Sequence, residues 1–202
     1  QQYVNDKRGL LPAGIDIAHA RDDARILRGR MDLLISNAQL GLVLVFICLS
    51  FFLDLRLAFW VMMGIPISFL GGILIAGAVG VTMNMIVMFG LIVVLGMIVD
   101  DAIVVGENVY RLMEEGLSPE DAAVEGASQV ARPVLATILT SIAAFGPILV
   151  MQGTTGAFLR PLPLIVSFCL IVSLLEALLI LPVHLAFHAG VVKAATAEDS
   201  RW

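Results

Sequence analysis

The stretch LGMIVDDAIVVGENV, from Leu95 to Val109, combines a membrane-like composition with two charges. Its residues are mostly apolar, as in a membrane-spanning helix, yet Asp100 and Asp101 stand side by side within it. A charged side chain at the centre of a bilayer costs roughly 2.5–3.5 kcal/mol on insertion scales. Such residues usually face a bundle interior or a water-lined cavity and mark ion or proton pathways. The stretch therefore predicts a transmembrane helix with a functional polar face.

The composition of the whole chain is also typical of a membrane protein. Of the 202 residues, 59% are hydrophobic, and the mean hydropathy is +0.98. Soluble domains are about 45–50% apolar. The net charge of −5 comes from a few short charged segments. The sequence opens at Gln1 without an initiating Met, and we expect it to be a piece of a longer protein.

Five apolar segments are long enough to cross a bilayer, which takes about 20 helical residues. They predict an all-α membrane protein, a bundle of five transmembrane helices, with spans near residues 33–53, 57–80, 83–110, 132–151 and 162–188. The charged, amphipathic segment 111–131 is expected outside the bilayer. Within it, Ser118 and Pro119 predict the start of a short helix. Residues 152–163 predict a loop.

Residues 1–32 are polar and predict an extramembrane segment. Alternating apolar residues in Gly14–Ala20 favour a short strand, and a helix is expected from Asp22 or Asp23 onward. Lys and Arg gather at the cytoplasmic ends of spans. On this basis one face is predicted to be cytoplasmic, that of Arg56, Arg111, Arg132 and Lys193. Residues 1–32 are then periplasmic, and residues 191–202 form a cytoplasmic tail.

The paired aspartates are the candidate functional residues. Neighbouring residues on a helix point about 100° apart, so Asp100 and Asp101 cannot both face lipid. The predicted spans contain no interior Lys or Arg to pair with them. Two close carboxylates in a low dielectric titrate as a coupled pair, which suits a proton relay. The alternative is a structural role, in which each aspartate pairs with a cation elsewhere and holds helices together.

Other polar residues in the spans are weaker candidates. Glu176 is a possible secondary intramembrane acid, which either faces the same interior as the pair or hydrogen-bonds a neighbouring helix. Thr137 is expected to hydrogen-bond its own helix backbone. His184 and His188 lie one turn apart but have no third ligand, so we expect interface anchors and no metal site.

The segment GLIVVLGMIVDDAIVVGENVYRLMEEG closely resembles the fourth transmembrane helix of resistance-nodulation-division (RND) efflux pumps, in the hydrophobic and amphiphilic compound efflux branch. Other segments resemble the same family: FFLDLRLAFWVMMGIPISFLGG, MNMIVMFG, RPVLATILTSIAAFGPIL and EALLILPVHLA. The resemblance covers nearly the whole chain. It implies a transporter of twelve helices in two repeats, with these spans as helices two to six of the first repeat. Residues 1–32 would then end a periplasmic porter domain and lead into a helix.

For function, the resemblance implies drug/proton antiport across the bacterial inner membrane, in which Asp100 and Asp101 take up and release protons. The proton-motive force drives such pumps without a cofactor, and they are transporters rather than enzymes. Homotrimers work with a periplasmic adaptor and an outer-membrane channel on lipophilic small molecules, and no nucleic acid is involved. The family places a Lys of the second repeat beside the pair, outside this chain. The intact pair favours organic substrates over heavy metals.

The sequence leaves two other functions to compare with efflux. One is a non-drug RND relative that handles lipids or acts as a sensor through the same proton-relay core. The other is an intramembrane aspartyl protease, which needs two acids facing each other from separate helices. The adjacent positions of Asp100 and Asp101 on one helix argue against that chemistry.

Overall fold

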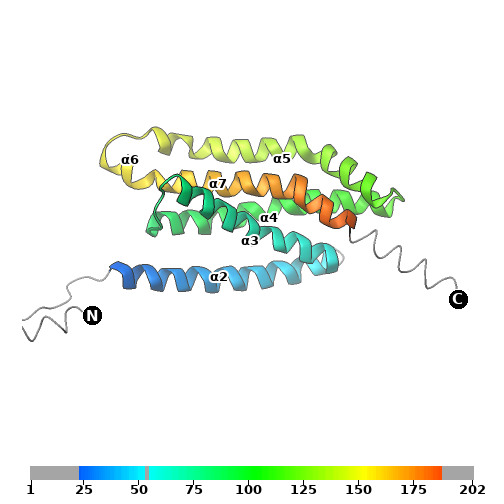
Figure 1. Ribbon diagram of the computed structural model, residues 1–202, viewed down its shortest axis with the longest axis horizontal. Helices are drawn as coiled ribbons and strands as arrows, with labels where there is room; N and C mark the ends of the chain where they lie inside the picture. Colours follow the sequence, from blue (N-terminus) through cyan, green and yellow to red (C-terminus); the bar gives the residue numbers. More distant parts are fainter. Residues whose placement is uncertain (1–22, 53–54, 188–202) are drawn as a thin grey trace, which may run out of the picture.

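The computed structural model describes residues 23–52 and 55–187, and these form long helices lying side by side (Figure 1). The elements are α2 (Asp23–Phe52), α3 (Leu55–Ala78), α4 (Met85–Glu114), α5 (Pro119–Val150), α6 (Gly153–Leu159), α7 (Pro161–Leu175) and the π-helical turn η1 (Glu176–Ile180). Helical backbone continues from η1 to residue 187. Five stretches are long and apolar enough to cross a membrane, and the described ranges contain no strand. The predicted all-α bundle is confirmed, whereas the predicted strand at Gly14–Ala20 lies outside the described residues.

The core of the bundle lies where α3, α4 and α7 meet, with α5 and α2 on opposite sides (Figure 1). Its fully buried side chains include Val61, Val94 and Ile165. The outer surface is equally apolar, and Leu44 and Leu74 are largely exposed. An apolar exterior of this kind suits contact with lipid, where exposed hydrophobic side chains carry no penalty.

Glycines on α3 allow α7 to pack closely against it. A Cβ atom at Gly72 would lie 2.9 Å from the backbone Cα of Cys169, and one at Gly71 would lie 2.7 Å from Cγ1 of Val172. Small residues permit this close approach of membrane helices. Among the other glycines of α3, α4 and the turn between them, Gly90 also packs against α7, but three have open space around them: Gly77, Gly80 and Gly96.

The connection between α3 and α4 is a short turn closed by a helix cap. The side-chain carbonyl of Asn84 accepts hydrogen bonds from the backbone N–H groups of Ile86 and Val87, at 2.9 and 3.0 Å. These two donors would otherwise have no partner within the helix. Asn84 therefore fixes where α4 begins, and with it the register of the aspartate pair farther along the same helix.

The structure differs from the sequence-based expectation in the connections on either side of the fourth span. A short helix within residues 111–131 and a separate span were expected, but α5 is one unbroken helix of 32 residues, capped by Ser118. Pro133 lies inside it without ending it. The expected loop at residues 152–163 contains α6. A change from polar to apolar side chains marks a change of surroundings, not the end of backbone hydrogen bonding. Where the membrane boundary crosses α4 and α5 stays a prediction.

Candidate functional site

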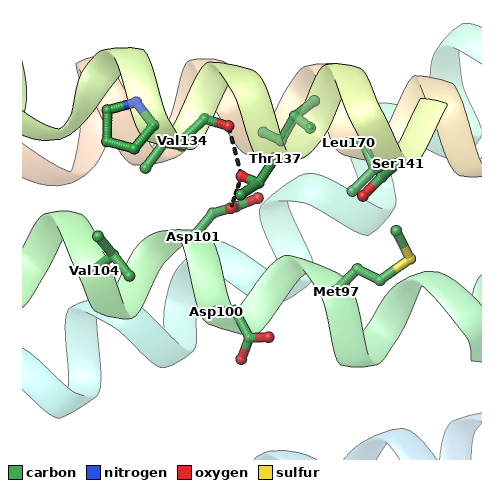
Figure 2. A pocket seen from close by; sticks show the side chains of 10 residues that line it. Met97, Asp100, Asp101, Val104, Val134, Thr137, Ser141 and Leu170 are labelled. Carbon is green, nitrogen blue, oxygen red and sulfur yellow. Dashed lines mark hydrogen bonds between the residues drawn. The ribbon is translucent and has the colours of Figure 1, made fainter. Parts of the chain in front are cut away.

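Asp101 lies on the face of α4 that packs against α5, and it is only 9% exposed. Its carboxylate accepts a hydrogen bond from the Thr137 hydroxyl, with 3.4 Å between the oxygen atoms (Figure 2). The same hydroxyl donates to the backbone carbonyl of Val134 at 2.8 Å. One hydroxyl has one proton to donate, so these two acceptors compete for it. The shorter bond to the backbone is the stronger one in this structure.

Asp100 points away from α5, on a different face of α4 from Asp101 (Figure 2). Its side chain is exposed, although it lies within a helix long and apolar enough to cross a membrane. This agrees with the angle of about 100° between neighbouring residues on a helix. The two acids therefore occupy different surroundings: Asp101 lies within the bundle, and Asp100 lies on a surface that these helices leave uncovered.

A cavity of about 280 Å³ lies beside the pair, between α4 and α5. Both aspartates line it, together with Thr137 and Ser141 of α5 and Leu170 of α7. A water molecule needs roughly 30 Å³ and two or more polar partners. The cavity has room for several waters, and its polar groups gather around the carboxylates.

No cation pairs with Asp100 or Asp101 among the residues that the structure describes. Arg111 follows on α4, but it forms an ion pair with Glu115 and donates a hydrogen bond to Asn108. Ten residues of helix, about 15 Å, separate it from Asp101. The aspartate pair therefore has no countercharge within these helices.

Glu176 is buried, with 3% of its surface exposed, but it does not line the cavity of the aspartate pair. It faces α3 instead: a Cβ atom at Gly64 would lie 2.5–2.8 Å from its three carboxyl atoms. Within the described ranges, its carboxyl forms no hydrogen bond to a neighbouring helix. Neither of the two sequence-based alternatives for Glu176 describes this position.

Of the two histidines near the end of the fifth span, the structure describes only His184. The ring of His184 stacks at a tilt on Trp60, with 4.3 Å between centroids, and its Nδ1 atom lies 2.9 Å from the carbonyl oxygen of Ile180. His188 lies outside the described residues. The described part of the chain contains no group of three His, Cys, Asp or Glu side chains that could hold a metal ion.

A close contact and a hydrogen bond join the last part of α4 to the first part of α5. The predicted topology places this end of both helices on the cytoplasmic side. A Cβ atom at Gly126 would lie 2.8 Å from Cα of Val109. The side-chain amide of Asn108 donates to the carbonyl oxygen of Gly126 at 2.8 Å. The two helices therefore meet backbone to backbone at Gly126, and this contact sets the spacing that brings Thr137 to Asp101.

Comparison with known proteins places the chain in a family. The model of the AcrB/AcrD/AcrF family matches residues 2–201, nearly the whole sequence. The chain belongs to this family. The resemblance to RND efflux pumps is thereby confirmed, and the chain is part of a multi-pass membrane transporter.

Individual relatives agree with the AcrB/AcrD/AcrF assignment. The toluene efflux pump membrane transporter TtgE of Pseudomonas putida is 28% identical over 95% of this chain. The multidrug resistance protein MdtC of Escherichia coli is 31% identical over 85% of it. A crystal structure of a heavy metal efflux pump covers 90% of the chain with a TM-score of 0.72 and 27% identity. The chain spans only 17–18% of the length of these proteins.

Thr137 is the site residue that sequence reasoning missed in part. It does bond its own helix backbone, as expected, but it also donates to Asp101, 36 positions away in the chain. A contact between two helices has no signal in the spacing of residues along one of them. The depth of Thr137 within the fourth span, matched to that of Asp101 in the third, is the clue that could have suggested it.

Proposed function

We propose that this chain carries the proton relay of an RND efflux transporter, with Asp100 and Asp101 as the residues that bind and release protons. The observation that carries this proposal is the position of Asp101. It is buried in an apolar helix, it lies beside a cavity with room for water, and no cation within the described residues neutralises it. Intramembrane acids in such surroundings usually belong to ion or proton pathways.

The shared hydroxyl of Thr137 suggests how protonation is linked to helix packing. When Asp101 is ionised, its carboxylate attracts the hydroxyl proton of Thr137 and ties α5 to α4. When Asp101 binds a proton, the charge-assisted attraction is lost: the Thr137 hydroxyl donates to Val134 alone, and its oxygen can accept the O–H of the Asp101 carboxyl as a neutral hydrogen bond. Hydrogen bonds to charged groups are worth about 1.5–3 kcal/mol, against about 1 for neutral ones. Proton entry therefore loosens the contact between α4 and α5 at this point.

The membrane potential supplies the energy for this cycle. Moving one proton across 100 mV releases about 2.3 kcal/mol. No cofactor is needed. The coupled process is export of lipophilic small molecules, in keeping with the toluene and multidrug transport named for TtgE and MdtC.

In this proposal the five helices are helices two to six of the first repeat of a twelve-helix transporter in the bacterial inner membrane. The exposed face around Asp100 is the place for the second repeat and its Lys, which supply the missing cation. The complete protein works as a homotrimer with a periplasmic adaptor and an outer-membrane channel. The similarity to a heavy metal efflux pump makes metal ions the competing substrate class.

The test is dye efflux from cells that carry the full-length transporter, with wild type and Asp101→Asn at matched expression, with and without a protonophore. Glu107→Gln is the matched control, because Glu107 is an exposed acid on the same helix. We expect Asp101→Asn to abolish efflux, Glu107→Gln to preserve it, and the protonophore to stop the wild type. Survival in toxic metal salts, measured alongside, separates the two substrate classes.

Efflux by Asp101→Asn at the wild-type rate would overturn the relay assignment, because Asn cannot bind and release a proton. Persistence of wild-type efflux in the presence of protonophore would show that another gradient drives transport.

A further inference from the structure

A second polar cluster is buried between α3 and α7, apart from the aspartate pair. It consists of Ser68 on α3, Ser173 on α7 and Glu176 at the start of η1, with exposed fractions of 0%, 0% and 3%. The hydroxyl oxygens of both serines have no hydrogen-bond partner. A buried polar group left in this state is destabilising, so its presence calls for an explanation.

The packing of α3 against α7 brings these three side chains to one place. The helices run in opposite directions, and Gly64 meets the Glu176 carboxyl. Ser68 comes one turn after Gly64 on the same face of α3, and Ser173 comes one turn before Glu176 on the same face of α7. The two serines therefore stand at the same level, one helical turn from the carboxyl group.

The backbone at Glu176 is also unusual. The π-helical turn begins there, and the N–H of Leu181 bonds to the carbonyl oxygen of Glu176, five residues back. Single π turns inside α-helices are rare and are found frequently at functional sites. This observation concerns the backbone, and it marks the same residue as the unpartnered hydroxyls beside it.

No countercharge faces Glu176 from the elements that pack around it, which are α3, α4, α5 and α7. Of the acids on α4, Asp100 and Asp101 line a different cavity. Arg132 of α5 is exposed, and His184, two turns after Glu176, stacks on an indole ring of α3. Among the described residues, α3 and α7 present no charged side chain at this level. An ionised carboxylate here would be buried and unpaired, which strongly disfavours the charged form.

Glu176 and the aspartate pair lie toward the same end of the bundle. Gly90 of α4 packs against Leu162, Ile165 and Val166 of α7, and these two helices run in the same direction. Asp101 comes eleven residues after Gly90, and Glu176 comes ten to fourteen residues after these three residues. The bundle therefore holds acids at neighbouring levels on two sides of the α4–α7 contact.

We propose that Glu176, together with the hydroxyls of Ser68 and Ser173, forms a second intramembrane proton-binding site between α3 and α7. The protonated carboxyl removes the unpaired charge, and its O–H group is a donor that a serine hydroxyl can accept. Neither serine hydroxyl is hydrogen-bonded to the carboxyl in this structure, so the Glu176 side chain has to turn toward them, one helical turn away, when it takes up a proton. This inference goes beyond the aspartate relay and stands on the packing of α3 and α7.

The test is infrared spectroscopy of the purified full-length transporter in lipid, at a pH where exposed carboxyl groups are ionised. Wild type, Glu176→Gln and Asp101→Asn are compared. We expect a carbonyl band of a protonated carboxyl group that is present in the wild type and in Asp101→Asn and is lost in Glu176→Gln. The same band in Glu176→Gln as in the wild type would overturn the proposal.

A second variant tests the site without changing Glu176. Ser68→Ala with Ser173→Ala removes both hydroxyls and should shift the frequency of the Glu176 band, because the protonated carboxyl then has no serine oxygen toward which it can turn and donate. An unshifted band would show that the serines take no part. The band reports on Glu176 directly, so this result is independent of whether Asp101→Asn abolishes dye efflux.

Discussion

Substitution of Gly72 by Ala tests whether the close contact of α3 and α7 holds the bundle together. The added Cβ atom would lie 2.9 Å from Cα and 3.0 Å from the backbone nitrogen of Cys169. Carbon atoms in favourable contact are about 3.5–4.0 Å apart, so α7 has to move away by about 0.5–1 Å. Backbone atoms of a packed helix cannot rotate aside as the end of a flexible side chain can.

The effect of Gly72→Ala on the free energy of unfolding combines a cost and a gain. Overpacking of a tightly packed interface costs about 1–3 kcal/mol. Ala is better than Gly in the interior of a helix by about 1 kcal/mol, which offsets part of that cost. Gly77, one residue before α3 ends, has open space around it, so Gly77→Ala adds no overpacking cost, and the helix-interior preference for Ala applies to it only in part. The difference in unfolding free energy between the two variants is therefore at most the overpacking cost of about 1–3 kcal/mol.

The assay is thermal denaturation of the full-length transporter in detergent, followed by the loss of the monodisperse peak in size-exclusion chromatography. We expect Gly72→Ala to melt below the wild type and Gly77→Ala to melt at or above it. Equal melting temperatures for the two variants would refute the reasoning, because the contact with Cys169 would then carry no cost.

Two further predictions concern hydrogen bonds at the helix ends. Asn84→Ala removes the cap of α4 and should lower stability by about 1 kcal/mol in the same thermal assay, whereas Asn84→Ser, which keeps a capping oxygen, should restore most of it. An unchanged melting temperature for Asn84→Ala would show that the cap is dispensable. Asn108→Leu removes the side-chain donor to the carbonyl oxygen of Gly126. We expect faster amide hydrogen exchange in the first turns of α5, after Ser118. Exchange at the wild-type rate would contradict this expectation.

Much of the fold was predictable because lipid imposes a simple rule on sequence. Each span needs about 20 apolar residues, so the five helices are visible as five hydrophobic blocks. The unbroken α5 was not predictable in the same way. Its charged first half and apolar second half differ in composition, but the backbone hydrogen bonds continue through both. Hydropathy reports what surrounds a helix, not where it ends.

The site was predictable only in part. The presence of Asp100 and Asp101 within an apolar helix, and their different directions, followed from the sequence and helix geometry. Which of the two faces α5 depends on how α4 is rotated against its neighbours, and the sequence of α4 does not contain that information. The same holds for Glu176, whose carboxyl meets Gly64 on a helix more than a hundred positions earlier in the chain.

The close contact at Gly126 can act as a pivot for α5, because it joins this helix to α4 backbone to backbone. From this pivot, Thr137 lies eleven residues in one direction and Ser118 lies eight residues in the other, arms of about 16 and 12 Å. A tilt of α5 that separates Thr137 from Asp101 swings Ser118 the opposite way, through about three quarters of the same distance. The loop between α4 and α5 would then be displaced each time Asp101 gains or loses a proton.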